Sequence, residues 1–302
     1  MPLPNREQLT AAAEKLLRRV GRRAGWQSVR ADYYSPLVDL AVLPASIFSL
    51  PAPMPGLELD LDRQLAFVRR ELMPYVAELN VPVRAPDGPF RLFLDNPWYG
   101  PLDAELLYAM VRWSAPERVL ELGSGFSTLF IERALEDAGR PGAPAAHVVV
   151  DPYPSPLLAH APRELDVRPI SGAELPAAQF GELVAGDILF VDTSHVVRPG
   201  GEVVRLVLEL LATLRPGVLV QFHDIFRPFE YPRIFYERFD VHWQEQYLLQ
   251  AFLAFNPNFE VLCANHALWR QRRDEAAELF PGLREGMQPG GFWFRRRATS
   301  ES

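Results

Sequence analysis

The sequence contains a single cysteine, Cys263, among 302 residues. One cysteine cannot form an intrachain disulfide or a cysteine-based zinc site, so the fold must be held together by other means. Cys263 lies in an apolar run, and we expect it to be buried in the core. Lysine is equally scarce, because Lys15 is the one basic residue among 31 that is not arginine. We interpret that bias as a property of codon usage and not as chemistry.

Long hydrophobic runs are also missing. No run approaches the roughly 18 to 20 apolar residues that a transmembrane helix needs. The N-terminus lacks the basic region and apolar core of a secretory signal. We therefore expect a cytoplasmic protein that does not act at a membrane. The net charge of −7 disfavours a general nucleic-acid binder, which would present a basic face.

Residues 1–90 differ in pattern from the rest of the chain. Hydrophobic periodicity predicts helices over residues 5–23 and 60–79, and a proline-rich passage separates them. We interpret this part as a helical cap or lid over a ligand site. A surface for forming a homo-oligomer is the alternative, and the sequence does not decide between the two.

Residues 91–302 show a regular alternation of strands and helices. A short strand is predicted at 91–96, followed by a helix that begins at Asp103, a plausible N-cap. Seven further strands are predicted over residues 118–122, 147–150, 165–170, 187–191, 218–222, 259–263 and 291–294. This alternation implies an α/β fold with a Rossmann-like, doubly wound parallel sheet. The pattern alone leaves open how the last two strands pair.

Four of these strands end in polar residues, namely Glu121, Asp151, Asp192 and the pair His223-Asp224. The carboxyl ends of parallel strands meet at one edge of the sheet, where ligands bind. A single acidic residue there would be weak evidence, because surface loops are rich in aspartate. Four polar strand ends at the same edge predict a ligand site.

A glycine-rich turn follows the first of these strands. Gly123 and Gly125 allow a ligand to approach the backbone closely, because glycine has no Cβ. A nicotinamide-binding turn would carry a third glycine at position 128, which is threonine, and an acid about 20 residues further on. Glu121 would also repel a pyrophosphate. An NAD(P)-dependent oxidoreductase therefore remains only as an alternative.

The chain resembles the class I S-adenosylmethionine-dependent methyltransferases over about residues 95–295. Glu121, Gly123 and Gly125 match their acidic-x-Gly-x-Gly motif, and Asp151 matches the acid that holds the ribose hydroxyls. The resemblance implies S-adenosylmethionine as cofactor, and a seven-stranded sheet of order 3-2-1-4-5-7-6 whose last two strands form an antiparallel edge. It implies cofactor contacts at Glu121, Gly123, Ser124, Gly125, Ser127, Asp151 and Asp192.

Two further blocks, residues 186–195 and 222–232, resemble a bacterial branch of small-molecule and sugar O-methyltransferases. That likeness implies a hydroxyl of a sugar or natural product as the methyl acceptor. A non-catalytic cofactor-binding subunit is the other alternative, but such a subunit has no need of polar residues at every strand end.

A hydroxyl is a poor nucleophile until its proton is removed, so a general base is expected at this edge. The predicted catalytic residues are His195, His223 and Asp224. Metal-dependent members of the class place a divalent metal at the ends of strands 4 and 5, which implies Asp192, His223 and Asp224 as ligands. A histidine in that set suits a transition metal better than Mg²⁺. Aromatic residues that could line an acceptor pocket are Tyr33, Tyr34, Trp98, Tyr99 and Tyr231.

Overall fold

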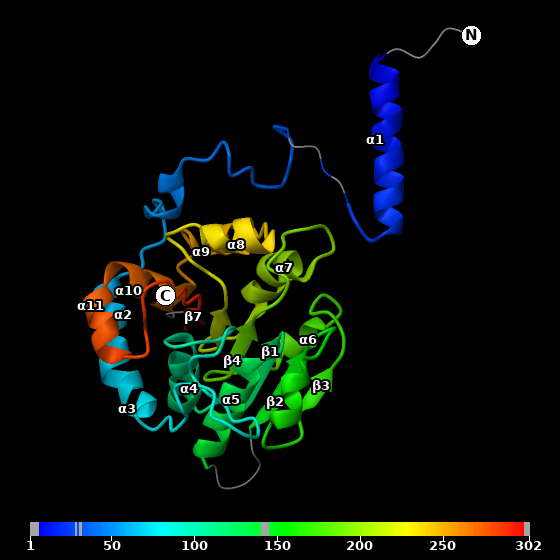
Figure 1. Ribbon diagram of the computed structural model, residues 1–302. Helices are drawn as coiled ribbons and strands as arrows, with labels where there is room; N and C mark the ends of the chain where they lie inside the picture. The colour runs from blue at the N-terminus through cyan, green and yellow to red at the C-terminus, as the bar shows by residue number, and fades with distance from the viewer. Residues whose placement is uncertain (1–5, 28, 30–31, 140–144, 299–302) are drawn as a thin grey trace.

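The computed structural model describes residues 6–27, 29, 32–139 and 145–298. These residues contain a seven-stranded sheet of order β3-β2-β1-β4-β5-β7-β6, with helices packed against it (Figure 1). The predicted Rossmann-like sheet and its strand order are confirmed. The strands are β1 (Arg118–Leu122), β2 (Ala146–Val150), β3 (Asp166–Arg168), β4 (Ile188–Val191), β5 (Leu219–Phe222), β6 (Phe259–Ala264) and β7 (Phe292–Arg296).

The first five strands are parallel to one another, whereas β7 runs antiparallel to both β5 and β6. Strands β4 and β5 are buried along their whole length, because helices cover both of their faces. Cys263 in β6 is fully buried, as predicted. The carboxyl ends of β1, β2, β4 and β5 therefore lie at one edge of the sheet.

The longer helices agree with the predicted ranges except at two points. The predicted helix over 266–279 is broken at Arg272, whose φ of −131° and ψ of 49° are not helical. The helices are α1 (Arg6–Arg23), α2 (Leu61–Phe67), α3 (Met73–Val76), α4 (Asp103–Ser114), α5 (Phe126–Asp137), α6 (Ala177–Gly181), α7 (Glu202–Arg205), α8 (Arg233–Phe239), α9 (Glu245–Leu253), α10 (Asn265–Gln271) and α11 (Arg273–Leu279). Short 3-10 or π segments are η1 (Ala45–Phe48), η2 (Val68–Leu72), η3 (Pro156–His160), η4 (Leu206–Leu210) and η5 (Leu211–Thr213).

The second point is Asp103, which is not the N-cap of α4. Leu102 takes the N-cap position, and its backbone N–H donates to Glu105 Oε2 at 2.9 Å. Asp103 is the first residue of the helix and is only 3% exposed, and its carboxylate bonds to groups from other elements, described below. The N-cap prediction was therefore wrong.

The predicted strand at 91–96 was also wrong, because the side chain of Asn96 organises this segment as a loop. Asn96 Oδ1 accepts hydrogen bonds from the backbone N–H groups of Trp98 and Tyr99 at 3.1 and 2.7 Å. Its Nδ2 donates to the carbonyl of Tyr99 at 2.7 Å. Asparagine side chains commonly satisfy loop backbone in this way, in competition with strand pairing.

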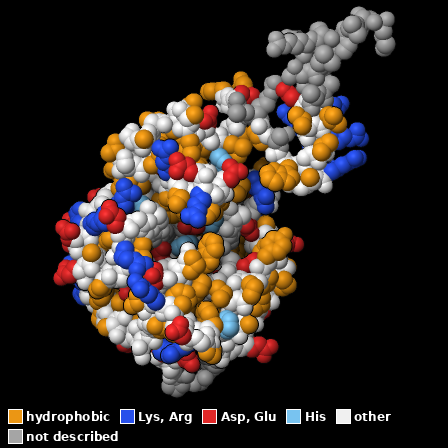
Figure 2. Space-filling model, in the orientation of Figure 1, with side chains coloured by type: hydrophobic (Ala, Val, Ile, Leu, Met, Phe, Trp, Pro, Cys, Tyr) orange, Lys and Arg blue, Asp and Glu red, His pale blue; other side chains and the backbone are white. Residues whose placement is uncertain are grey.

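The N-terminal region contains two different parts. Helices α2 and α3 join through η2 and pack into the main core, where Val68 and Leu72 are fully buried. Helix α1 instead stands away from the body, and its basic side chains project from it (Figures 1 and 2). Leu16, Leu17 and Val20 on this helix are exposed. Whether this region serves as a lid or as an oligomer contact, and a boundary at residue 90, stay predictions.

None of the helices in the described part of the chain is long and apolar enough to cross a membrane.

Candidate functional site

The turn between β1 and α5 is held in place by a close approach of the backbone. Gly123 has a φ of +97°, and a Cβ on it would lie 1.9 Å from the carbonyl oxygen of Asp192. Its N–H donates to the carbonyl of Val150 at 2.9 Å. Glycine is required here because any side chain would push apart the ends of β1 and β4.

Gly125 differs from Gly123, because a Cβ built on it meets no atom within 4 Å. The turn therefore faces open space at the N-terminus of α5. Ser124 Oγ donates to Asp151 Oδ2 at 2.6 Å, and the N–H of Ser155 donates to Ser124 Oγ at 2.9 Å. The structure thus brings together Ser124, Gly125 and Asp151, three of the predicted cofactor-binding residues, beside this space.

Glu121 lies beneath the turn and is fully buried. Ser127 Oγ donates to Glu121 Oε1 at 2.7 Å, and His147 Nε2 lies 3.0 Å from Glu121 Oε2. His147 Nδ1 lies 2.7 Å from Glu132 Oε1, and Arg163 pairs with the same carboxylate at 2.7 Å. Both oxygens of Glu121 are thus engaged by protein groups. In this geometry Glu121 supports the turn from below. A direct contact of Glu121 with a cofactor stays a prediction.

Burial alone would lower the pKa of His147, but the hydrogen bonds with Glu121 and Glu132 outweigh it and raise the pKa to about 8. The charges of His147 and Arg163, against the effect of burial, hold the pKa of Glu132 below its usual range. The imidazole is therefore cationic at neutral pH and joins β1, β2 and α5 under the turn.

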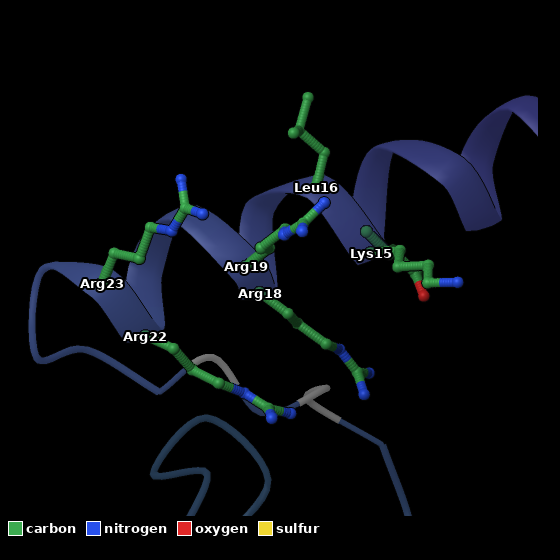
Figure 3. Close-up of a pocket in the computed structure, with 7 residues that line it drawn as sticks. Lys15, Leu16, Arg18, Arg19, Arg22 and Arg23 are labelled. Atoms are coloured by element: carbon green, nitrogen blue, oxygen red, sulfur yellow. The ribbon is translucent and has the colours of Figure 1, made fainter.

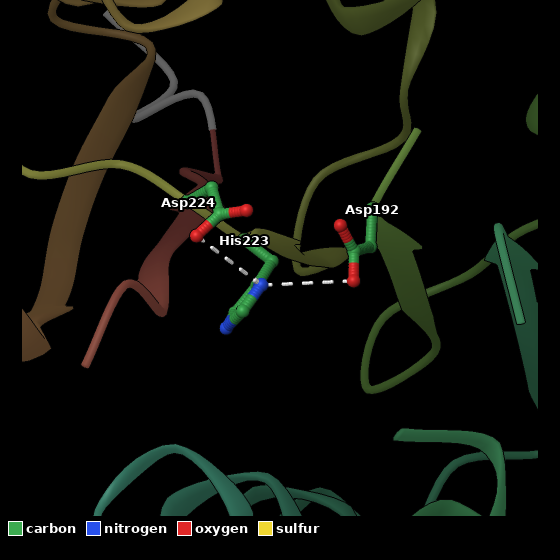
Figure 4. A group of neighbouring side chains, drawn as sticks. All are labelled: Asp192, His223 and Asp224. Atoms are coloured by element: carbon green, nitrogen blue, oxygen red, sulfur yellow. Dashed lines mark ion pairs between the residues drawn. The ribbon is translucent and has the colours of Figure 1, made fainter. Parts of the chain in front are cut away.

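The ends of β4 and β5 bring Asp192, His223 and Asp224 together (Figure 4). One ligand atom from each lies within 4.8 Å of the other two. His223 Nδ1 is 3.6 Å from Asp192 Oδ2 and 3.8 Å from Asp224 Oδ1. The three predicted metal ligands are therefore neighbours, and an imidazole with two carboxylates is a donor set that suits a transition metal.

His195 lies behind this cluster and is buried. Its Nδ1 is 2.7 Å from Glu245 Oε2, and its Nε2 is 3.2 Å from Asp192 Oδ1 and 3.6 Å from Asp224 Oδ2. His195 adopts a left-handed φ of +57°, which is uncommon for residues other than glycine. The backbone N–H of Glu245 donates to the carbonyl of His195 and helps to hold this conformation. Both ring nitrogens of His195 thus face carboxylates.

The carboxylates set the charge of both rings. Burial alone would lower the pKa of His195, but the hydrogen bonds with Asp192 and Glu245 outweigh this effect and raise the pKa well above its ordinary value. Burial would likewise lower the pKa of His223, but the negative charges of Asp224 and Asp192 outweigh this effect and raise the pKa to about 9. At neutral pH both imidazoles are therefore cationic.

The two aspartates of the cluster respond differently to their surroundings. Burial raises the pKa of Asp224 above its usual range. Burial acts the same way on Asp192, but the charge of His223 and the bond from His195 lower the pKa of that carboxyl. Asp224 is therefore the more basic of the two carboxylates.

Asp103 is a member of this site that the sequence analysis did not identify. Its Oδ2 lies 3.2 Å from His223 Nε2 and accepts the N–H of Gly290 at 2.8 Å. Its Oδ1 accepts the N–H of Gly291 at 2.9 Å and the amide of Asn265 at 2.7 Å. The signal in the sequence was the Gly290-Gly291 pair before the last strand. A Cβ on Gly291 would lie 2.9 Å from Asp103 Oδ1, so only glycine leaves room for the carboxylate.

Glu245 is the second missed member. It is fully buried in α9, where it pairs with His195, and burial raises the pKa of its carboxyl. Its position in a helix rich in apolar residues was the available signal, because an isolated acid is rarely buried without a partner.

A cavity of about 610 Å³ opens above the cluster. Asp103, Asp192, His223 and Asp224 line it, whereas the turn at Gly123–Gly125 and Asp151 do not. The other lining residues are Asp95, Asn96, Pro97, Trp98, Gly100, Pro101, Phe235, Phe239, Val241, Trp243, Met287, Gln288 and Pro289. Asp192 thus adjoins both the turn and the cavity, because Gly123 packs against its backbone and its side chain lines the cavity.

The five aromatic residues proposed for a pocket are placed differently. Trp98 lines the cavity, as proposed. Tyr99 is buried below it, with its ring 4.7 Å from that of His223. Tyr231 is buried in a hydrophobic cluster with Phe226, so it supports the site without lining it. Tyr33 and Tyr34 are exposed and pack on each other, and they are not among the cavity-lining residues.

A second hollow lies beside α1 (Figure 3). All of its described lining residues belong to that one helix, including Lys15, Arg18 and Arg22. Among the described residues, a ligand there would meet the side chains of one helix alone, so we do not regard it as a site.

Comparison with known proteins supports methyl transfer. Residues 120–225 match the model of a family described as a methyltransferase domain. This segment runs from within β1 to the residue after Asp224 and contains all the catalytic, cofactor-binding and metal-binding residues predicted from the sequence. Asp103 and Glu245 lie outside it. A search of the curated proteins finds no match.

Among solved structures, the chain is similar to a "putative methyltransferase" from Thermobifida fusca YX. The identity is 18%, the match covers 86% of this chain and 100% of the other, and the TM-score is 0.36. These values are too low to transfer a function.

The two glycines of the turn give a matched pair of variants. Gly123→Ala should lower the free energy of unfolding by more than about 2 kcal/mol, because its Cβ would overlap the carbonyl of Asp192. Gly125→Ala should leave stability nearly unchanged, because its Cβ enters open space. Urea unfolding followed by circular dichroism measures both. Equal stability of the two variants would contradict the close approach.

The buried position of His147 predicts a pH-dependent stability. Its pKa is raised in the folded state, so its contribution is complete below pH 6.5 and is lost as pH rises through 8. The loss of stability caused by His147→Gln should therefore be larger at pH 6 than at pH 9, by about 2 kcal/mol. His160→Gln is the control, because His160 lies in η3, where it is exposed and its ring stacks on that of Phe90. A pH-independent difference would refute the ionised network.

Proposed function

We propose that this protein transfers a methyl group from S-adenosylmethionine to a hydroxyl of a small-molecule acceptor such as a sugar or natural product. The observation that carries the proposal is the juxtaposition of an open glycine turn with a cavity whose floor consists of the polar ends of β4 and β5. Asp192 adjoins both, since Gly123 packs against its backbone and its side chain lines the cavity.

The residues around the turn fit the cofactor. Open space at Gly125 lets a ligand reach the backbone, and Asp151 offers a carboxylate for the two ribose hydroxyls beside Ser124. Bound there, S-adenosylmethionine supplies an electrophilic methyl group on a positively charged sulfur. The residues that would hold it are Gly123, Ser124, Gly125, Asp151 and Asp192. Glu121 would contribute through its hydrogen bond with Ser127.

The alternative of an NAD(P)-dependent oxidoreductase has less support. The backbone N–H of Gly125 donates to Thr128 Oγ1 at 3.1 Å, so it is not free for a pyrophosphate. A non-catalytic subunit also fits poorly. Burying the pairs His195–Glu245 and His223–Asp103 costs desolvation energy, which a protein without a reaction would have little reason to retain.

On the acceptor side, Asp224 is the general base in our proposal. An ionised carboxylate only accepts hydrogen bonds, whereas the rings of His195 and His223 already face carboxylates on their nitrogens. His223 lines the cavity beside Asp224 and holds its carboxylate by charge. His195 does not line the cavity, so it acts as a positioning residue through Asp192 and Asp224.

Calorimetry with S-adenosylhomocysteine tests the cofactor assignment. Asp151→Ala should weaken binding about tenfold or more, because it removes a charge-assisted acceptor for the ribose hydroxyls. Asp166→Ala is the matched control, since Asp166 lies at the amino end of the neighbouring strand β3, whereas Asp151 follows the carboxyl end of β2. If well-folded wild-type protein binds no S-adenosylhomocysteine, the proposed function is wrong.

Substitution of the base tests the acceptor side. Asp224→Asn should lower kcat about 100-fold or more while leaving S-adenosylhomocysteine affinity nearly unchanged, because it removes proton transfer and keeps the side-chain shape. His195→Gln should lower kcat less, since it disturbs only the position of the carboxylates. Single-turnover methylation of the acceptor measures both. Wild-type turnover by Asp224→Asn would remove Asp224 from this role.

A bound divalent metal is a second candidate for activating the hydroxyl, because it lowers the pKa of a ligated oxygen. Asp192, His223 and Asp224 would hold it once His223 gives up a ring proton to the solvent, and their ligand atoms within 4.8 Å of one another favour the idea. The candidate predicts one Mn²⁺ bound per chain, lost in His223→Ala, and turnover that stops on chelation and returns with Mn²⁺ better than with Mg²⁺. Turnover unchanged after exhaustive chelation would eliminate the metal and leave Asp224 as the base.

A further inference from the structure

The cavity above the cluster has an apolar wall and an acidic floor. The wall comes from three separate segments, namely the loop before α4, the region from α8 to α9 and the loop before β7. Its apolar side chains are Pro97, Trp98, Pro101, Phe235, Phe239, Val241, Trp243, Met287 and Pro289. A volume of about 610 Å³ falls within the range of pockets that bind drug-sized molecules, about 300 to 1,000 Å³.

The ionisable side chains that line the cavity are mostly acidic. Among the described residues that line the cavity, none is arginine or lysine, while Asp95, Asp103, Asp192 and Asp224 are acidic. His223 is the one lining residue that can carry a positive charge, and Asp103 and Asp192 are already beside it. Behind the lining, Arg284 pairs with Asp95, and the His195 ring lies between Glu245 and the two aspartates of the cluster. The carboxylates around the cluster still outnumber its two imidazoles, so a phosphate or carboxylate entering the cavity would meet repulsion that the apolar wall does not screen.

The mouth of the cavity exposes large aromatic side chains. Trp98 is 75% exposed and Phe239 is 56% exposed, and both line the cavity. Trp98 is held in this outward position, because its backbone N–H donates to Asn96 Oδ1 and the loop around it is buried at Asn96 and Tyr99. A flat apolar ligand would cover these two rings and gain by removing them from water.

We infer that the acceptor is an uncharged, amphipathic hydroxyl compound, with an apolar ring system against Trp98 and Phe239 and the reacting hydroxyl at Asp224. We expect phosphate esters, carboxylates and sugars linked to nucleoside diphosphates to bind more weakly. The role of the hydroxyl rests on the proposed function, whereas the selection against anions rests on the lining of the cavity alone.

Two matched probes test the selection. In 4-methylumbelliferyl β-D-glucoside and 4-methylumbelliferyl β-D-glucuronide the same aromatic ring is joined to the same sugar, except that a hydroxymethyl group becomes a carboxylate. Calorimetry with the full chain, with and without S-adenosylhomocysteine, should give at least tenfold tighter binding of the glucoside. Equal or tighter binding of the glucuronide would overturn the inference, and so would the failure of both probes to bind.

Substitutions at the mouth locate the binding. Trp98→Ala should weaken glucoside binding about tenfold, whereas the control Trp26→Ala should not, although Trp26 is also 75% exposed. Gln288→Arg places a positive charge on the lining and should reduce the preference for the glucoside over the glucuronide at least threefold relative to the neutral Gln288→Met. Loss of affinity in Trp26→Ala equal to that in Trp98→Ala would overturn the placement.

The experiment separates this inference from the proposed function. If S-adenosylhomocysteine does not bind but the preference for the glucoside persists, the methyl donor is wrong and the selection by the cavity stands. If S-adenosylhomocysteine binds and neither probe is preferred, the acceptor class is wrong and the donor assignment stands.

Discussion

The buried carboxylate of Asp103 is the constraint on which the acceptor side depends. A buried charge must be satisfied by hydrogen bonds, and Asp103 receives them from four groups. They come from His223 after β5, from Asn265 at the start of α10, and from Gly290 and Gly291 before β7. One side chain thus fixes α4 against the antiparallel edge of the sheet. The loop just before α4 and the loop just before β7 are two of the three segments that form the wall of the cavity.

Opposite charges alternate across the same edge. The order is Glu245, His195, the pair Asp192 and Asp224, His223, and Asp103. Each imidazole faces carboxylates on both sides, which keeps both rings cationic. Such an arrangement costs desolvation energy and yields little net stability. What it provides is position, because the two aspartates that reach the cavity are held from behind by groups that are themselves fixed.

The sequence predicted the positions of the residues around the glycine turn better than those around the cavity, and the reason is locality. The turn at Gly123 and Gly125, with its neighbour Asp151, follows directly from strands that alternate with helices, a pattern that places the ends at one edge. The acceptor side is assembled from segments near residues 95–103, 235–245 and 287–291, and their proximity depends on strand pairing that the pattern left open. Asp103 was misread because an acid at the start of a helix is typical of an N-cap. The strand predicted at 91–96 failed because the side chain of Asn96 competes for its backbone.

The acidic floor also constrains the order of events in the proposed reaction. A free alkoxide formed by proton transfer to Asp224 would still lie beside the charged carboxylate of Asp192, and that repulsion would make it costly. The hydroxyl proton should therefore pass to Asp224 only as the oxygen loses its negative charge to the new bond with carbon. The positive charge of His223 therefore serves mainly to hold Asp224 in position before the proton is transferred. Stabilising an alkoxide is the lesser role of that charge. Base and methyl acceptor would act in one step, so the placement of Asp224 by His195 and His223 limits the rate as much as its basicity does.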